Sequence, residues 1–333
     1  MKASLKKSLM AVALAVPGLM FNAAAADEEY NLTVAGASPG GLWSMLGAGL
    51  DSALKEAHPG STVTYQTSGG GIANVAALQR DDADLAIIED AVLQLAIDGE
   101  EPFREPAGDD IRVLTNLYTW APMQPIMRED FAEKHGIESF SDIADVEAPI
   151  TVAINKRGNI ASSVAEAMLE SIGAGADEIE SWGGDLIYAA SSEQADLIKN
   201  RRVDMILNSL FVGHSSIQEL ASSVDVKMLP VSEESAKEVA EKTGTQTFTI
   251  PDDAYEWTPH ETPTVTISAA LAVRADMEEE TAYNLTKAFF ENHEKIAGVH
   301  PAMKSLDKEV MASVEVIDYH EGAVRYLEEA GLR

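Results

Sequence analysis

The feature that most constrains the fold is a strand–loop–helix pattern that repeats three times between residues 30 and 99. In each repeat, a short β-branched or apolar run leads into a loop, and an apolar helical pattern follows. The second repeat, VTYQTSGGGIANVAAL at residues 63–78, places Thr, Ser and three Gly at the junction between strand and helix. This order is typical of a parallel sheet with helices on both faces.

A second αβ unit follows a long extended run. Residues 111–130 predict a strand, broken by Pro122 and Pro125, that leaves one sheet and enters another. The pattern of residues 140–213 then predicts the order helix, strand, helix, strand, helix and strand. Residues 264–276 are predicted to form one more strand, after the chain returns to the first lobe. Residues 277–298 predict one amphipathic helix, and we expect the helical C-terminal part to pack on the first lobe.

The predicted fold class is therefore α/β, with two lobes that are each a mainly parallel sheet flanked by helices. The ligand cleft is expected between the lobes, with hinges near residues 119–124 and 262–265. The expected boundaries are residues 1–26 for a signal peptide, 27–119 for lobe I, 120–262 for lobe II, and 263–333 for the return to lobe I with the C-terminal helices.

The N-terminus predicts export. Three lysines precede a mostly apolar run, and the alanines at 23–26 supply a cleavage site near Ala26, which predicts a cleaved signal peptide and a periplasmic protein. No later stretch is apolar for long enough to span a bilayer. The net charge of −31 argues against nucleic acid as a partner, and the absence of cysteine excludes disulfides and thiol chemistry.

The loops after the predicted strands carry the candidate binding groups. Ligands of open α/β sheets bind outside the carboxyl ends of the strands, where helix N-termini favour anions. The loops at residues 37–41 and 67–71 each put small polar residues and glycine before a helix, although a simple turn with a helix cap explains either loop taken alone. Glu89 and Asp90 follow the third strand. One interpretation is that their carboxylates accept hydrogen bonds from an ammonium or hydroxyl group of a ligand, and the other is that Asp90 caps the next helix. Arg157 is a rare positive charge that either binds a carboxylate or pairs with surface acids.

No catalytic or metal-binding motif stands out. The seven histidines form no HxxxH or HExxH pattern, no GxSxG elbow is present, and no GK[ST] follows the SGGG stretch. We therefore expect a binding protein rather than an enzyme, with no cofactor and no metal site.

The chain resembles the TAXI family of solute-binding proteins, the receptors of one class of TRAP transporters. The stretches that carry the likeness are LTVAGASPGGLWSMLGAGL, VTYQTSGGGIANVAALQRDDADLAIIEDAVLQLAIDGEEPF, DMILNSLFVGHSSIQELA and the C-terminal YHEGAVRYLEEAGL, and they span nearly the whole chain after residue 26. Two loops depart from the family pattern. Gly41-Leu42-Trp43-Ser44 replaces Gly-x-Tyr-Tyr, and residues 157–163 replace a Gly-Ser-Gly loop.

The resemblance implies a type II periplasmic-binding-protein fold that closes on a small carboxylate, such as glutamate, glutamine or a 2-oxo or dicarboxylic acid. It implies delivery to TRAP membrane subunits, and we expect a monomer. The alternatives are a binding protein of an ABC importer or a sensor system and, less favoured, an exported enzyme. The residue patterns and the resemblance together select these candidate ligand-binding positions: Ala37, Ser38, Gly40, Gly41, Leu42, Trp43, Thr67, Ser68, Gly69, Gly70, Gly71, Glu89, Asp90, Asn155, Arg157, Asn159, Ser162, Ser163, Asn208 and Phe211.

Overall fold

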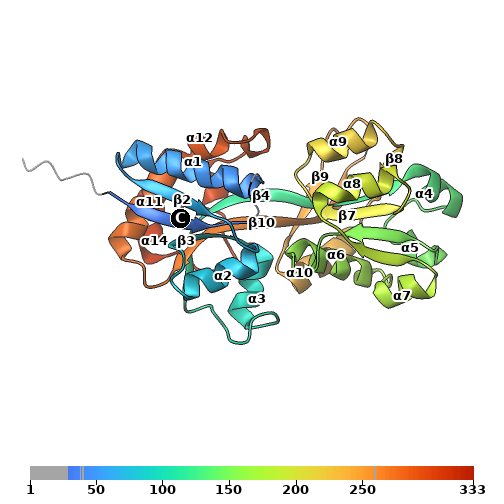
Figure 1. Cartoon of the computed structure of the whole chain (residues 1–333), viewed down its shortest axis with the longest axis horizontal. Coiled ribbons are helices and arrows are strands. Elements are labelled where there is room, and N and C mark those ends of the chain that lie inside the picture. Colours follow the sequence, from blue (N-terminus) through green and yellow to red (C-terminus); the bar gives the residue numbers. More distant parts are fainter. Residues whose placement is uncertain (1–28, 38, 40, 259) are drawn as a thin grey trace, which may run out of the picture.

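The computed structural model describes residues 29–37, 39, 41–258 and 260–333, so the predicted signal peptide lies outside the described residues. Within them the chain forms two α/β lobes connected by two long strands (Figure 1). The connecting strands are β4 (Ile111–Arg128) and β10 (Thr262–Arg274). None of the described helices is both long and apolar enough to cross a membrane.

Lobe I combines the first part of the chain with its C-terminal helices (Figure 1). Its elements are β1 (Asn31–Ala35), α1 (Leu42–Ala57), β2 (Thr62–Gln66), α2 (Gly71–Gln79), β3 (Leu85–Glu89), α3 (Asp90–Asp98), α11 (Glu279–Glu291), α12 (His293–Ala297), the 3-10 turn η1 (Pro301–Met303), α13 (Lys308–Met311) and α14 (Glu321–Glu329).

Lobe II is built from the middle of the chain. Its elements are α4 (Glu129–His135), α5 (Asp142–Val146), β5 (Thr151–Ile154), α6 (Ile160–Ser171), α7 (Ala176–Ser181), β6 (Asp185–Tyr188), α8 (Ser191–Lys199), β7 (Met205–Ser209), α9 (Ser215–Ala221), β8 (Val226–Met228), α10 (Glu233–Thr243) and β9 (Gln246–Ile250). The sequence patterns above did not predict β8, α10 or β9.

The strand order confirms the predicted mainly parallel sheets. Lobe I has the order β2-β1-β3-β10-β4, with β1 parallel to β2 and β3, and β10 antiparallel to β3 and β4. Lobe II has the order β4-β7-β5-β6, in which β5, β6 and β7 are parallel. Parallel strands are covered on both faces, and this explains why the β3 run from Leu85 to Ile88 is buried throughout.

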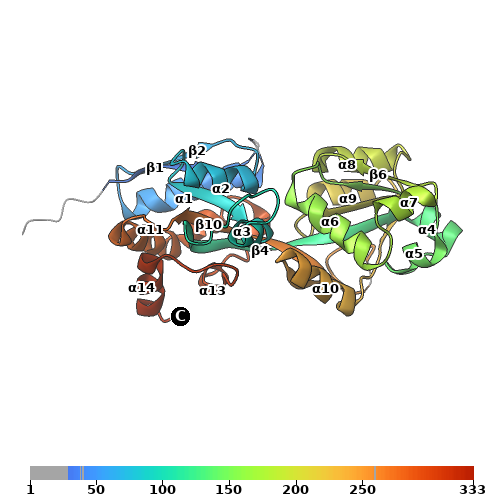
Figure 2. The same cartoon turned by 90° about the horizontal axis from the view of Figure 1, so that it is seen from below.

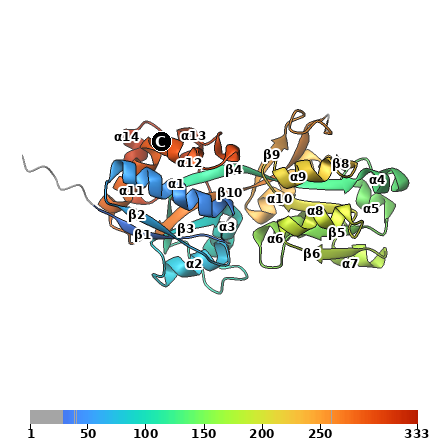
Figure 3. The same ribbon diagram turned by 45° about the horizontal axis from the view of Figure 1, so that its top comes forward.

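The long strand β4 belongs to both sheets, as its sequence predicted (Figure 3). Its residues up to Pro122 pair with β10, whereas Met123 to Met127 pair with β7. The change of partner falls within the stretch expected to act as a hinge. Hinge motion and the lobe boundaries stay predictions.

The C-terminal helices differ from the sequence prediction in one respect. The single helix expected over residues 277–298 is two helices, α11 and α12, separated at Asn292. The Asn292 side chain donates to the carbonyl oxygen of Ala288 at 2.9 Å, beside the Asn292 backbone N–H that donates to the same oxygen. Asparagine side chains that bond to nearby backbone in this way compete with helix continuation.

Candidate functional site

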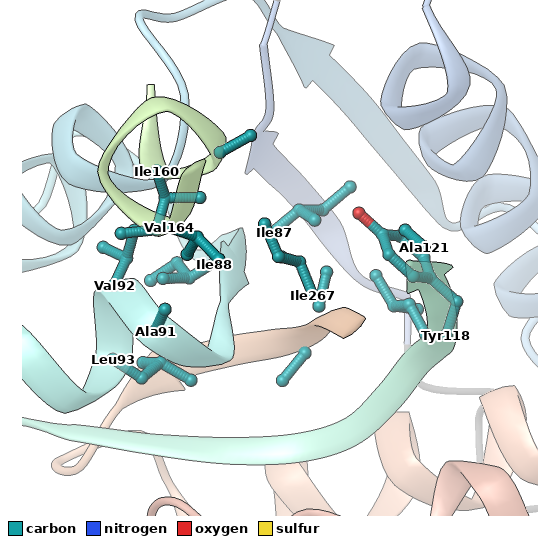
Figure 4. Close-up of a cluster of buried hydrophobic side chains, with 14 of the residues drawn as sticks. Ile87, Ile88, Ala91, Val92, Leu93, Tyr118, Ala121, Ile160, Val164 and Ile267 are labelled. Carbon is teal, nitrogen blue, oxygen red and sulfur yellow. The ribbon is translucent and has the colours of Figure 1, made fainter. Parts of the chain in front are cut away.

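A cleft of about 650 Å³ lies between the lobes and is lined from both of them. This volume is within the range of about 300–1,000 Å³ that is usual for small-molecule sites. Beside the cleft the lobes share an apolar contact, in which Ile160 and Val164 of α6 lie next to Ile88 and Val92 of lobe I (Figure 4).

Helices from both lobes begin at the cleft. The starts of α1 and α2 line it from lobe I, and the starts of α6 and α8 line it from lobe II. The first N–H groups of a helix lack intrahelical partners, and each helix N-terminus carries roughly half a positive charge. Among the described lining residues there is no Lys or Arg. Backbone dipoles rather than cationic side chains therefore favour an anion here.

The glycine-rich loop before α2 is held by a small buried network. The Ser68 hydroxyl donates at 2.5 Å toward the Gly36 carbonyl and the Asn74 side-chain oxygen, and it accepts from the Gly70 N–H at 3.0 Å. Asn74 is fully buried and donates to the carbonyls of Gly36 and Ile87 at 2.8 and 2.7 Å. Gly70 has φ +101° and ψ −166°, a conformation that essentially only glycine adopts. The loop is thus preorganised by Ser68, which also lines the cleft, and by Asn74, which does not.

Glu89 is the one carboxylate among the described residues that line the cleft. Its Oε2 atom is buried without a hydrogen-bond partner and lies against the backbone of Gly71, where a Cβ atom would collide with it. Burial raises the pKa of Glu89 to about 7, and the neighbouring Asp90 acts in the same direction. Near neutral pH this group therefore changes from a hydrogen-bond donor to an anion.

An aromatic group closes one side of the cleft. The Trp43 indole N–H donates to the Tyr118 hydroxyl at 3.0 Å, and Phe211 of lobe II packs edge-on against Tyr118 with 5.2 Å between ring centroids. Trp43 is buried, so its hydrogen bond and packing position Tyr118. Tyr118 lies on β4, which connects the lobes.

Lobe II contributes a cluster of amides around Ser191. The side-chain amides of Asn155 and Asn208 donate to the Ser191 hydroxyl oxygen at 3.3 and 2.8 Å. Because both amides donate to this oxygen, the hydroxyl proton is left to donate to a ligand. Asn155 and Ser191 line the cleft, while the buried Asn208 supports them from behind.

Two histidines face the cleft from opposite lobes. Nδ1 of His214 accepts from the Ser216 N–H, and Nδ1 of His300 accepts from the Ala302 N–H, at 3.2 and 3.1 Å. When such a ring is neutral, the bond to Nδ1 leaves Nε2 as the protonated nitrogen. Burial, helped by the nearby His300, lowers the pKa of His214, so this ring is a neutral donor at pH 7.

The loop that carries Leu210, Phe211 and His214 is fixed to the connecting strand. Tyr255 donates to the Gln124 side-chain oxygen at 2.8 Å and accepts from the Gly213 N–H at 3.0 Å. The Gln124 side-chain amide in turn donates to the Leu210 carbonyl at 2.5 Å.

The Tyr255→Phe variant is expected to lower the free energy of unfolding by about 1–2 kcal/mol, because it leaves buried partners at Gln124 and Gly213 unsatisfied. Urea denaturation measures this loss. The matched control is Tyr283→Phe, whose hydroxyl bonds the exposed Glu329, and we expect it to change stability by less than about 0.5 kcal/mol. Equal losses in the two variants would contradict the assigned role of Tyr255.

Eleven of the predicted positions line the cleft, and the structure brings them together from both lobes. They are Ala37, Gly41, Leu42, Trp43, Ser68, Gly69, Gly70, Glu89, Asn155, Asn159 and Phe211. Ser38 and Gly40 lie outside the described residues.

The other predicted positions are not among the residues that line the cleft. Thr67 and Gly71 flank the glycine loop, and Ser162 instead donates to the backbone carbonyls of Lys156 and Asn159. Arg157 lies over the Tyr188 ring, 3.6 Å from its centroid, and is not among the residues that line the cleft. Asp90 and Ser163 line other pockets, and Asn208 supports Ser191.

Several lining residues were not predicted. Ser191 follows a strand and opens a helix, the signal that selected the other loops, so the same rule finds it. The sequence offers no such signal for Tyr118, His214, Ile267 or His300, which reach the cleft through the tertiary fold. The remaining lining residues that sequence reasoning missed are Met45, Ala121, Ile160, Ala161, Ser209 and Leu210.

Within the described part of the chain, no three His, Asp or Glu side chains come together as a metal site. The cleft groups are hydrogen-bond donors, one titratable carboxyl group and aromatic rings. This arrangement suits reversible binding of a small anion or zwitterion.

Comparison with solved structures shows the same fold. MatC from Rhodopseudomonas palustris, solved with bound malate, is 13% identical, with a TM-score of 0.55 over 91% of this chain and 97% of that chain. A TctC solute-binding protein from Polaromonas, solved without ligand, is also 13% identical, with a TM-score of 0.52 over 91% of this chain and 96% of that one. Residues 34–331 match the NMT1-like family, which covers both lobes. The chain therefore belongs to the NMT1-like family.

Proposed function

We propose that the protein is an exported solute receptor that binds a small carboxylate between its lobes. The ligand is an amino acid such as glutamate or glutamine, or a 2-oxo or dicarboxylic acid. The observation that carries this proposal is the convergence of helix N-termini from both lobes on a cleft whose described lining contains no Lys or Arg. The malate in MatC supports testing dicarboxylates first.

Each lobe supplies part of the ligand site. Lobe I offers the backbone N–H groups near Gly41 and Gly70 together with the Glu89 carboxyl group, and lobe II offers Asn155, Asn159 and the Ser191 hydroxyl. Closure about β4 and β10 brings the two halves onto one ligand and excludes water, which strengthens each polar contact. We assign residues 27–119 and 263–333 to lobe I and residues 120–262 to lobe II.

The receptor is proposed to serve a TRAP-type transporter as a TAXI protein. The motif resemblance of the glycine loop and of the C-terminal YHEGAVRYLEEAGL supports this assignment, and the N-terminal pattern supports export to the periplasm. Transport with the membrane subunits is then expected to need an ion gradient and no ATP.

A thermal-shift screen of residues 27–333 tests the binding function. The panel holds amino acids, 2-oxo acids, dicarboxylates, sugars and polyamines. A carboxylate at a hundred times its Kd is expected to add about 2.7 kcal/mol of stability, a shift of several degrees. Stabilisation by sugars alone would contradict the proposal.

A further inference from the structure

A second pocket of about 260 Å³, here called the rear pocket, lies on the opposite face of the connecting strands from the ligand cleft. Residues that are adjacent in the sequence line different cavities. Glu89 and Ile267 line the cleft, whereas Asp90 and Ser268 line the rear pocket. Ile267 and Ser268 are neighbours on β10, at an irregularity in its pairing with β4, and they line different cavities.

The rear pocket is formed by both lobes. Helix α3 and residues 313–316 line it from lobe I, and the end of α10 with residues 244–246 line it from lobe II. Figure 2 shows α10 and α13 on the same side of the connecting strands. The lobes approach closely here, because a Cβ atom on Gly244 would lie 2.7 Å from Cβ of Gln94.

The floor of the rear pocket carries buried polar groups. Asp90 is 7% exposed, and its Oδ1 accepts from the N–H groups of Ala91 at 2.8 Å and Ser268 at 3.3 Å. These bonds fix the carboxyl group, and Oδ2 is left buried without a partner. The hydroxyl of Ser268, which is 2% exposed, is buried beside the Asp90 carboxyl group and interacts with it. A buried polar group of this kind carries a desolvation penalty that a bound ligand removes.

The charged residues that line the rear pocket are all acidic. Glu241 and Glu315 are exposed residues on its lining, and no Lys, Arg or His is found among the described residues that line it. Glu241 pairs only loosely with Lys237, at 3.9 Å between two exposed side chains. The described carboxylates do not gather as a three-ligand metal site. An organic ammonium ion suits such separated acceptors, because it carries its own N–H donors.

We propose that the rear pocket binds a short aliphatic amine, with one ammonium group on Asp90 Oδ2 and Ser268 and a second cationic group toward Glu241 and Glu315. Putrescine has this chemistry, and its single chain fits the size of the pocket. Charge-assisted hydrogen bonds to a buried carboxylate supply the affinity.

Bound amine is expected to influence the ligand cleft. The rear pocket exists only while α3 and α10 hold their present separation, so amine binding favours that arrangement of the lobes. By linkage, the carboxylate and the amine change each other's affinity by the same factor. This coupling, unlike the site itself, rests on the proposed function.

Isothermal titration of the purified protein with putrescine, without any carboxylate, tests the site. We expect one saturable site, binding about tenfold or more weaker in Asp90→Asn, and binding severalfold weaker in the surface double variant Glu241→Gln with Glu315→Gln. The double variant keeps the test decisive if Asp90→Asn folds poorly. The control Glu105→Gln changes an exposed acid that does not line the pocket and is expected to bind putrescine as the native chain does.

Three results would overturn the proposal. The first is the absence of saturable putrescine binding at constant ionic strength. The second is loss of binding in Glu89→Gln with retention in Asp90→Asn, because this places the amine in the ligand cleft. The third is saturation by Na⁺ or Ca²⁺ that Asp90→Asn abolishes, because this assigns a metal ion to the pocket. Failure of carboxylate binding in the thermal-shift screen leaves the amine site untouched, so the two proposals fail separately.

Discussion

Above pH 7, the Glu89→Gln variant is expected to be more stable than the native chain by up to about 3 kcal/mol. Burial raises the Glu89 pKa from 4.5 to about 7, so the folded state binds a proton that the unfolded state releases between these values. The stability that this proton contributes is fully present below pH 4.5 and is lost as the pH rises through 7. Glutamine lacks the titration and keeps the shape.

Urea denaturation at pH 5 and pH 8 measures this effect as the difference between the variant and the native chain. Asp90 titrates in the same range, because burial raises its pKa to about 7 as well. Its charge also raises the pKa of Glu89, so the measured difference includes the change that the substitution causes in the titration of Asp90. The control Glu105→Gln, on an exposed loop, is expected to shift stability by less than about 0.5 kcal/mol at either pH. A Glu89→Gln difference that is the same at pH 5 and pH 8 would contradict the account.

The titration of Glu89 also distinguishes acids that lack an ammonium group from amino acids as ligands. For an acid without an ammonium group, such as L-malate, ionised Glu89 repels the ligand, so affinity is expected to fall as the pH rises past 7. For an amino acid such as L-glutamate, ionised Glu89 accepts from the ammonium group, so affinity is expected to rise. Glu89→Gln removes either trend.

The Gly70→Ala variant is expected to lose about 1–3 kcal/mol of stability and to bind carboxylates about tenfold to a hundredfold more weakly. A Cβ atom at Gly70 meets nothing within 4 Å, so the loss comes from the backbone conformation and not from a clash. To relieve that strain the loop changes conformation, and its N–H groups then no longer point at the ligand.

The matched control is the neighbouring glycine of the same loop. A Cβ atom on Gly69 makes an ordinary contact, 3.4 Å from Cβ of Ala73, so Gly69→Ala is expected to fold with nearly native stability. Urea denaturation and ligand titration measure both variants. Equal behaviour of the two alanine variants would show that the conformation of Gly70 has no special role.

Much of the fold is predictable from local pattern. The β3 strand is a continuous apolar run, and the prolines in β4 mark the stretch where that strand changes partner from β10 to β7. The break at Asn292 was missed because apolar spacing continues through it, while the side-chain bond to Ala288 ends the helix.

The site was only partly predictable, for a physical reason. A strand-end loop can be recognised from its own residues, and this found the glycine loop, Glu89 and Asn155. The direction of a side chain depends on its neighbours, and Tyr188 holds Arg157 in a stack away from the cleft lining. His300 reaches the cleft only because the chain returns to lobe I after lobe II is complete.

The most direct test of the central claim is isothermal titration that compares a carboxylate with its carboxamide isostere, beginning with the acid that gives the largest thermal shift. If helix N-termini and hydroxyl donors hold the carboxylate, the amide should bind about tenfold to a hundredfold more weakly, because hydrogen bonds to a charged group are worth about 1.5–3 kcal/mol. Equal affinity for acid and amide would contradict carboxylate recognition by this cleft.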